Sequence, residues 1–157
     1  MTLLLSTFGI CVVSALVPLV NAEAYLGGVA ILGSGVGIWA LSAVAAIGQM
    51  VGKVVWYFVG ASSLRWRWVR RRIEAPSWQA RYATWQRRTR GSPWLVGGLV
   101  FASALVGLPP FAVISVLAGQ LAVPLPLFVL AGLVGRWLRF AAVLGGVAFL
   151  VEWGLVG

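Results

Sequence analysis

The apolar stretches of this chain are too long to form single helices within a membrane, and their length limits the folds open to it. Between Glu23 and Gly60 the sequence is almost wholly apolar for about 37 residues, near 55 Å as one straight helix. The hydrocarbon core of a bilayer is only about 30 Å thick. The run must therefore break. The glycine-rich stretch 33–37 is the predicted break, because glycine lowers the cost of a turn.

Such runs need lipid rather than water around them. Hydrophobic residues make up 61% of the 157-residue chain and charged residues 10%, and the mean hydropathy is +0.99. A typical soluble domain has about 25% charged residues. The apolar segment 1–20 lacks the positive start of a secretory signal, so we interpret it as a membrane segment that ends at Pro18. The sequence predicts an all-α integral membrane protein of the plasma or inner membrane.

The basic residues are concentrated in one segment. Of the 12 lysines and arginines, nine are arginines within residues 61–93, among several tryptophans, and they supply most of the net charge of +9. This composition is typical of amphipathic helices in the headgroup layer, and the positive-inside rule predicts a cytoplasmic linker. A disordered loop is the alternative. Because orientation and anionic lipid account for the cluster, we predict no nucleic-acid partner.

The side chains that most enzymes and metal sites use are scarce. The chain has no histidine, one cysteine and three acidic residues. A histidine base, an intrachain disulfide and a multi-cysteine cluster are excluded, and a carboxylate cage for a metal is not expected. No nucleophile–base pair is visible. We therefore predict no enzyme activity, no metal and no cofactor.

The two halves of the chain repeat one another within a single membrane domain. Residues 1–60 contain a segment broken near Pro18 and then a long helix, and residues 94–157 contain a segment broken at Pro109 and Pro110 and then a long helix. The second broken segment is either one kinked span or a re-entrant pair, because each piece is too short to span as a helix. We favour re-entrant tips at all three prolines. With a cytoplasmic linker the halves become inverted repeats, and a transport site is expected where they meet.

Four charged side chains fall within the apolar runs, where each costs about 3 kcal/mol on insertion scales: Glu23, Lys53, Arg136 and Arg139. The two arginines are three residues apart and share a helix face. Arg136 lies near mid-bilayer, about 13 Å along its helix. Since few other charges can compensate them, we predict that Glu23 approaches Arg136 or Arg139. The alternatives are a solvated loop for Glu23 and a cytoplasmic position for the Lys53 ammonium.

Small residues recur at helix-packing spacings. Gly48 and Gly52 precede Lys53, and Gly132 and Gly135 precede Arg136. Small residues spaced in this way let helix backbones approach closely. The sequence leaves open whether these glycines pack within the chain or in a homo-oligomer, and the same holds for the pairs Ala141/Gly145 and Ala142/Gly146.

Several of these motifs occur together in a recognisable order. They are Pro18-Leu-Val-Asn21-Ala-Glu23, Gly48-x-x-x-Gly52-Lys53 with Trp56-Tyr57, the stretch 107–119, and Gly135-Arg136-Trp-Leu-Arg139-Phe140. With them the chain resembles the DedA family, also called VTT-domain or SNARE-associated membrane proteins. The resemblance covers most of residues 10–145 except the linker. It implies movement or scrambling of phospholipids or, in bacteria, recycling of the polyprenyl-phosphate carrier lipid.

The chain departs from this family in two charged positions. Better-known members carry a second acid about a dozen residues after the first, and two arginines in the second re-entrant segment. Here the first place lies in the glycine stretch near Gly35, and the segment 105–119 has no arginine. Among those charges only Glu23 carries over. We infer that Arg136 and Arg139 supply the missing positive charge.

The sequence thus predicts a membrane lipid transporter or scramblase. A cationic pair at the midplane would hold a lipid phosphate while the lipid tails stay in the bilayer. Lys53, Asn21 and Ser115 are the further candidates for polar contacts with the lipid. The alternative is a non-transporting scaffold, whose Arg/Trp linker binds anionic lipid or a protein partner.

Overall fold

The computed structural model describes residues 2–17, 21–33, 35–63, 92–107 and 111–154. Within these ranges the chain is all-helical, as predicted. Its helices are α1 (Thr2–Leu16), α2 (Ala22–Ile31), α3 (Ile38–Ser63), α6 (Pro93–Val106), α7 (Phe111–Gln120) and α8 (Leu125–Glu152). Of these helices, α3 and α8 are long and apolar enough to cross a membrane.

Some predicted features lie outside the described residues. They are the three prolines proposed as re-entrant tips, Pro18, Pro109 and Pro110, and all but the ends of the linker 61–93. The re-entrant tips and the cytoplasmic linker therefore stay predictions.

Glycines with positive φ lie at two of the predicted breaks. The predicted break between α2 and α3 is confirmed, and Gly33 and Gly35 have φ values of 69° and 63° there. The predicted break after α6 is also confirmed. Gly107 ends that helix with a φ of 84°, and its N–H donates to the Ser103 carbonyl at 2.8 Å. Residues with a Cβ rarely adopt such φ values, so glycine at these positions fixes the helix ends.

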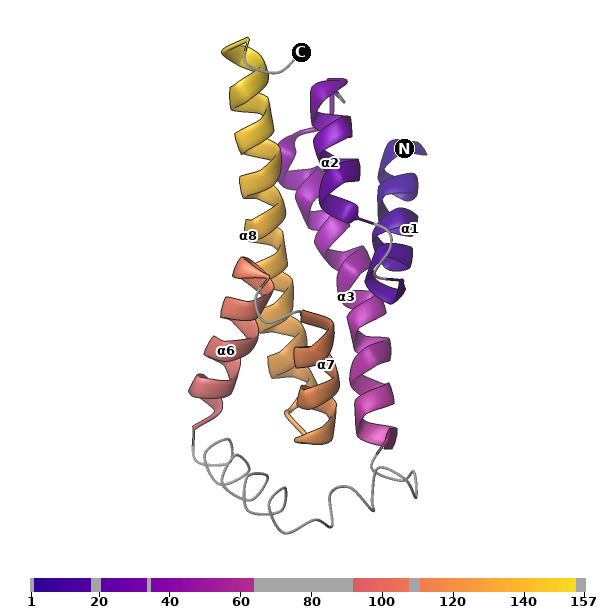
Figure 1. Cartoon of the computed structure of the whole chain (residues 1–157), viewed down its shortest axis with the longest axis vertical. Helices are drawn as coiled ribbons and strands as arrows, with labels where there is room; N and C mark the ends of the chain where they lie inside the picture. Colours follow the sequence, from indigo (N-terminus) through magenta and orange to yellow (C-terminus); the bar gives the residue numbers. More distant parts are fainter. Residues whose placement is uncertain (1, 18–20, 34, 64–91, 108–110, 155–157) are drawn as a thin grey trace.

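The two long helices run antiparallel through the molecule (Figure 1). Trp39 at the start of α3 contacts Trp137 well along α8, with ring centroids 5.7 Å apart. Tyr57 near the end of α3 contacts Phe128 near the start of α8, with centroids 5.3 Å apart. In Figure 1, α1 and α2 lie toward one end of the α3–α8 pair, and α6 and α7 lie toward the other.

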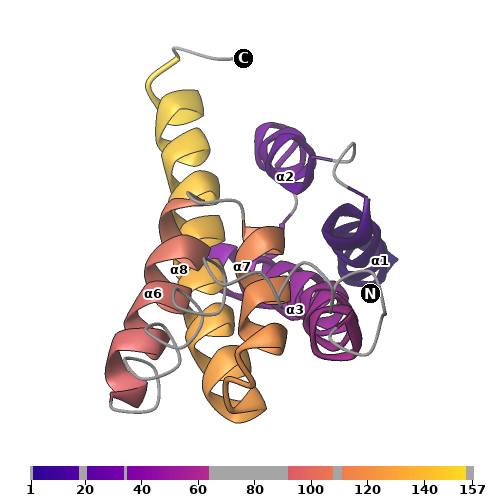
Figure 2. The ribbon, with the colours of Figure 1, turned by 60° about the horizontal axis from the view of Figure 1, so that its bottom comes forward.

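Each long helix carries short helices from both halves of the chain. Helix α1 packs on α3, and α6 packs on α8, so the first short helix of each half packs on the long helix of that half. The second short helices cross over, because α2 packs on α8 and α7 packs on α3 (Figure 2). The packing partners of the two halves therefore correspond one to one.

The four glycines singled out for packing lie at helix contacts within the chain. A Cβ on Gly48 would lie 2.7 Å from the Phe8 carbonyl oxygen, and one on Gly52 would lie 2.5 Å from the Ala15 Cβ. A Cβ on Gly135 would lie 2.7 Å from the Ala104 Cβ, and Gly132 faces the Met50 side chain in the same way. At Gly48, Gly52 and Gly135 the neighbouring helix backbone or a Cβ lies where a Cβ would be, whereas at Gly132 it is the end of a flexible side chain. Gly145 and Gly146, in contrast, have no atom near the Cβ position.

Candidate functional site

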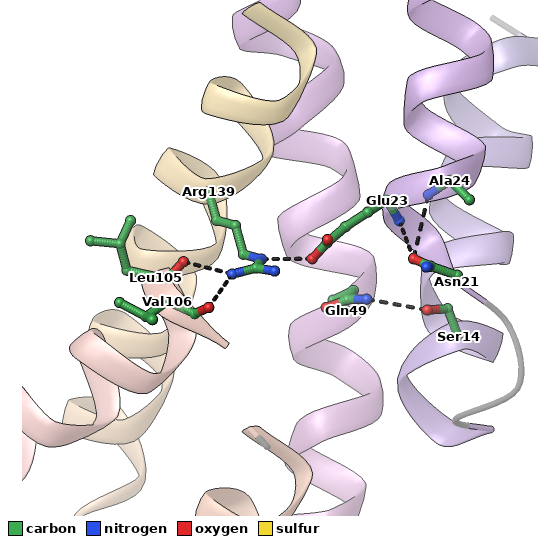
Figure 3. A network of polar contacts seen from close by, with 8 residues as sticks. All are labelled: Ser14, Asn21, Glu23, Ala24, Gln49, Leu105, Val106 and Arg139. Carbon is green, nitrogen blue, oxygen red and sulfur yellow. Dashed lines mark hydrogen bonds and ion pairs between the residues drawn. The ribbon is translucent and has the colours of Figure 1, made fainter. Parts of the chain in front are cut away.

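Asn21 fixes the start of α2 and so the place of Glu23. Its extended backbone ends the preceding segment, and its Oδ1 accepts hydrogen bonds from the N–H groups of Glu23 at 2.9 Å and Ala24 at 3.3 Å (Figure 3). An asparagine is a favoured N-cap because it satisfies N–H groups that the helix leaves free. Glu23 then lies in the first turn, where the helix dipole favours a carboxylate. Asn21 thus acts here as a cap.

Arg139 connects the start of α2 to the end of α6. Its Nε donates to Glu23 Oε1 at 2.6 Å, and its Nη1 donates to the Leu105 carbonyl oxygen at 3.0 Å and to that of Val106 (Figure 3). The last carbonyls of a helix have no partner within it, and a cation is favoured there. The predicted approach of Glu23 to an arginine is confirmed, and the partner is Arg139. The pair is partly accessible, with side chains 35% and 23% exposed.

Lys53 hydrogen-bonds to a carbonyl at the end of α1, as Arg139 does at the end of α6. Its Nζ donates to the Ala15 carbonyl oxygen at 3.0 Å, and the indole Nε1 of Trp56 donates to the same oxygen at 3.1 Å. Lys53 is only 7% exposed. The alternative in which its ammonium reaches the cytoplasmic surface therefore does not hold.

Arg136 is buried, and none of the described carboxylates forms an ion pair with it. It is 9% exposed, its guanidinium lies over the ring of Phe111 at 5.0 Å from the centroid, and its Nε has no hydrogen-bond partner among the described residues. Arg139 repels it, and Glu23, which is bonded to Arg139, attracts it only from a distance. A guanidinium keeps its proton in proteins, so the charge must be met by a partner or an aromatic face.

The other polar groups of the interior bond within the protein. Ser115 is fully buried, and its Oγ donates to the Phe111 carbonyl at 2.7 Å, so its hydroxyl proton is engaged within α7. Gln49 Nε2 donates to Ser14 Oγ at 3.2 Å, whereas Gln49 Oε1 is buried with no partner among the described residues. Sequence reasoning missed Gln49. A polar residue one turn before Lys53 in an apolar run was the available signal.

The described interior therefore holds more positive than negative charge. Lys53, Arg136 and Arg139 are set against the carboxylate of Glu23, and Glu152 is exposed at the end of α8. No group of three or more histidines, cysteines or acids in the described ranges could hold a metal ion. The arrangement is suited to binding an anionic group.

Comparison with known proteins agrees with the resemblance noted in the sequence. No curated protein and no solved structure matches the chain. The family model of the VTT domain matches residues 6–149, which include both halves and all four interior charges. Together with the span-length helices α3 and α8, the match indicates a membrane protein. The chain belongs to the VTT-domain family, the DedA and SNARE-associated group of membrane proteins.

Proposed function

We propose that this protein moves lipids across the cell membrane, as a transporter or scramblase, and that the lipid phosphate passes at Arg139. The ion pair between Arg139 and Glu23 carries the proposal. It joins helices from the two halves, and both side chains are accessible enough for a headgroup to reach them. A charged pair at membrane depth is costly, which favours a role in passage over a role in stability.

The contacts of Arg139 suit an exchange of anions. Its Nη1 is held by the carbonyls of Leu105 and Val106, so the guanidinium stays oriented when its Nε changes partner. The Glu23 carboxylate is on a different helix and can move away. A phosphate presents the same kind of oxygen acceptors, and the planar fork of arginine suits them. The headgroup then replaces the carboxylate while the lipid tails remain in the bilayer.

In this proposal the lipid passes between two inverted repeats, each of which contains a re-entrant segment. In support, Ala15 near the end of α1 packs against Gly52, and Ala104 near the end of α6 packs against Gly135. Both glycines lie in the interior of a long helix, well away from its ends. The broken segments would thus turn at membrane depth. Irregular backbone is tolerated there only where protein satisfies its polar groups, as Arg139 does for the end of α6.

A scrambling assay with reconstituted protein tests the proposal. Vesicles would contain a fluorescent phospholipid, and a membrane-impermeant reductant would report the lipid that reaches the outer leaflet. Wild-type protein should accelerate exchange over protein-free vesicles. We expect Glu23→Gln and Arg139→Gln each to slow it about tenfold or more, equivalent to about 1.4 kcal/mol in the barrier.

Glu152→Gln is the matched control, because that carboxylate is exposed. Its rate should equal that of wild type. A wild-type protein that exchanges lipid no faster than empty vesicles would contradict lipid movement. The scaffold function, in which the linker 61–93 binds anionic lipid or a protein partner, would then be favoured.

A further inference from the structure

The two halves place equivalent residues in equivalent contacts. A Cβ on Gly52 would meet the Ala15 Cβ and the Val12 carbonyl oxygen. A Cβ on Gly135 would meet the Ala104 Cβ and the Phe101 carbonyl oxygen. Phe101 is three residues before Ala104, just as Val12 is three residues before Ala15. Hence the end of α1 on α3 corresponds, residue by residue, to the end of α6 on α8. The residues that follow these glycines can be matched in the same way. Lys53 corresponds to Arg136, each one residue after its glycine, and Trp56 corresponds to Arg139, each four residues after it.

The same correspondence extends to the second short helices. The sequence offset from Ala15 to Ala104 also relates the first residues of α2 and α7, Ala22 and Phe111, and both helices are 10 residues long. The residue that corresponds to Glu23 is therefore Ala112. The first turn of α2 carries an acid, and the first turn of α7 carries none.

The two helix starts also differ in the charge that lies beside them. At α2 the Glu23 carboxylate meets Arg139. At α7 the guanidinium of Arg136 lies over Phe111, the first residue of the helix, with its Nε unpartnered in the part of the chain that the structure describes. Lys53 is close enough to be repelled by Arg136, and its Nζ hydrogen-bonds to a neutral carbonyl.

The start of α7 is therefore a place of positive potential. The nearly fully buried Arg136 lies over Phe111, the positive end of the helix dipole is there, and Lys53 is near enough to Arg136 to repel it. Buried charges without a counter-charge are strongly unfavourable, and arginine does not relieve this by losing its proton. Helix starts of this kind bind phosphate through their N–H groups and dipole.

We infer that the start of α7, with Arg136 over its first residue, binds one phosphate group from outside the chain near Ala112, the position that corresponds to Glu23 in α2. The phosphate belongs either to a lipid headgroup or to inorganic phosphate. As a lipid site it deepens the proposed function by adding a second phosphate position beyond Arg139. The inference that phosphate binds here does not depend on lipid movement, because the experiment below measures phosphate binding and not lipid transport.

Anion-dependent stability of the purified full chain in detergent tests the inference. Thermal unfolding would be followed against inorganic phosphate, short-chain phosphatidate in the micelles, and chloride at matched ionic strength. At least one of the two phosphate probes should raise the unfolding midpoint of wild type above the chloride series. A response to inorganic phosphate identifies a free-ion site, and a response to phosphatidate alone identifies a headgroup site. Equal midpoints in all three series would overturn the inference.

Two variants assign the response to this place. Ala112→Glu supplies a carboxylate at the position that corresponds to Glu23, and it should abolish the phosphate shift, whereas Ala112→Gln, of the same size and neutral, should keep it. Arg136→Gln combined with Lys53→Gln should also abolish the shift. If that double variant does not fold, the comparison of Ala112→Glu with Ala112→Gln still tests the site. A phosphate shift that persists in Ala112→Glu, or that Ala112→Gln loses equally, would refute the site.

Discussion

Replacing Gly119 by alanine should weaken the contact between the two halves of the protein, because α7 and α3 meet there backbone to backbone. A Cβ on Gly119 would overlap the Tyr57 carbonyl oxygen and lie 2.8 Å from the backbone nitrogen of Ala61. Neither atom belongs to a side chain that could rotate away. The added methyl group therefore has to displace α7 from α3 as a unit.

The expected loss follows from the groups around this contact. Overpacking of this kind costs about 1–3 kcal/mol. Displacement also strains the hydrogen bond from Tyr57 Oη to the Val123 carbonyl at 2.6 Å and the one from Gln120 to Ser63 at 3.1 Å, and losing one of them adds about 1 kcal/mol. Alanine recovers about 1 kcal/mol of helix propensity relative to glycine. The net expectation is a destabilisation of about 1–3 kcal/mol.

Equilibrium unfolding of the detergent-solubilised protein by denaturant measures this difference. Gly98→Ala is the matched control, because Gly98 is within α6 and nothing lies near its Cβ position. That variant should be as stable as wild type or more stable by up to about 1 kcal/mol. If Gly119→Ala unfolds at the same denaturant concentration as Gly98→Ala, the close approach of α7 and α3 is wrong.

Two further predictions concern the end of α1 and the orientation of the chain. Trp56→Phe removes one of the two donors to the Ala15 carbonyl and should cost about 1 kcal/mol in the same unfolding assay, whereas Trp94→Phe, at an 86% exposed side chain, should change nothing. Ser92→Cys, with Cys11 replaced by alanine, should resist a membrane-impermeant thiol reagent added outside intact cells. Efficient labelling there would reverse the predicted topology.

Local rules predicted where the helices end, since these breaks depend on residues close in sequence. The glycines at 33 and 35 adopt positive φ in the break expected there, whereas the second break, expected at Pro109 and Pro110, begins earlier, at Gly107. Contacts between segments that are distant in the sequence were harder to predict. Gly60 and Gly119 form the tight contact between α3 and α7. Ser115 lies four residues before Gly119, at packing spacing, but this spacing does not say which helix the residues meet. Their role depends on how the halves pack against each other, which no local pattern encodes.

The charged site shows the same division between local and tertiary information. Counting charges predicted that Glu23 would meet an arginine, but it did not choose between Arg136 and Arg139, since residues three apart share a helix face. The end of α6 makes the choice, because its last carbonyls hold Nη1 of Arg139 and leave Nε facing Glu23. Arg136, almost one turn closer to the start of α8, meets Phe111 instead. One carboxylate thus neutralises one guanidinium and leaves Lys53 and Arg136 without a counter-charge among the described residues, and Arg136 is the one at which we infer an anion from outside the chain.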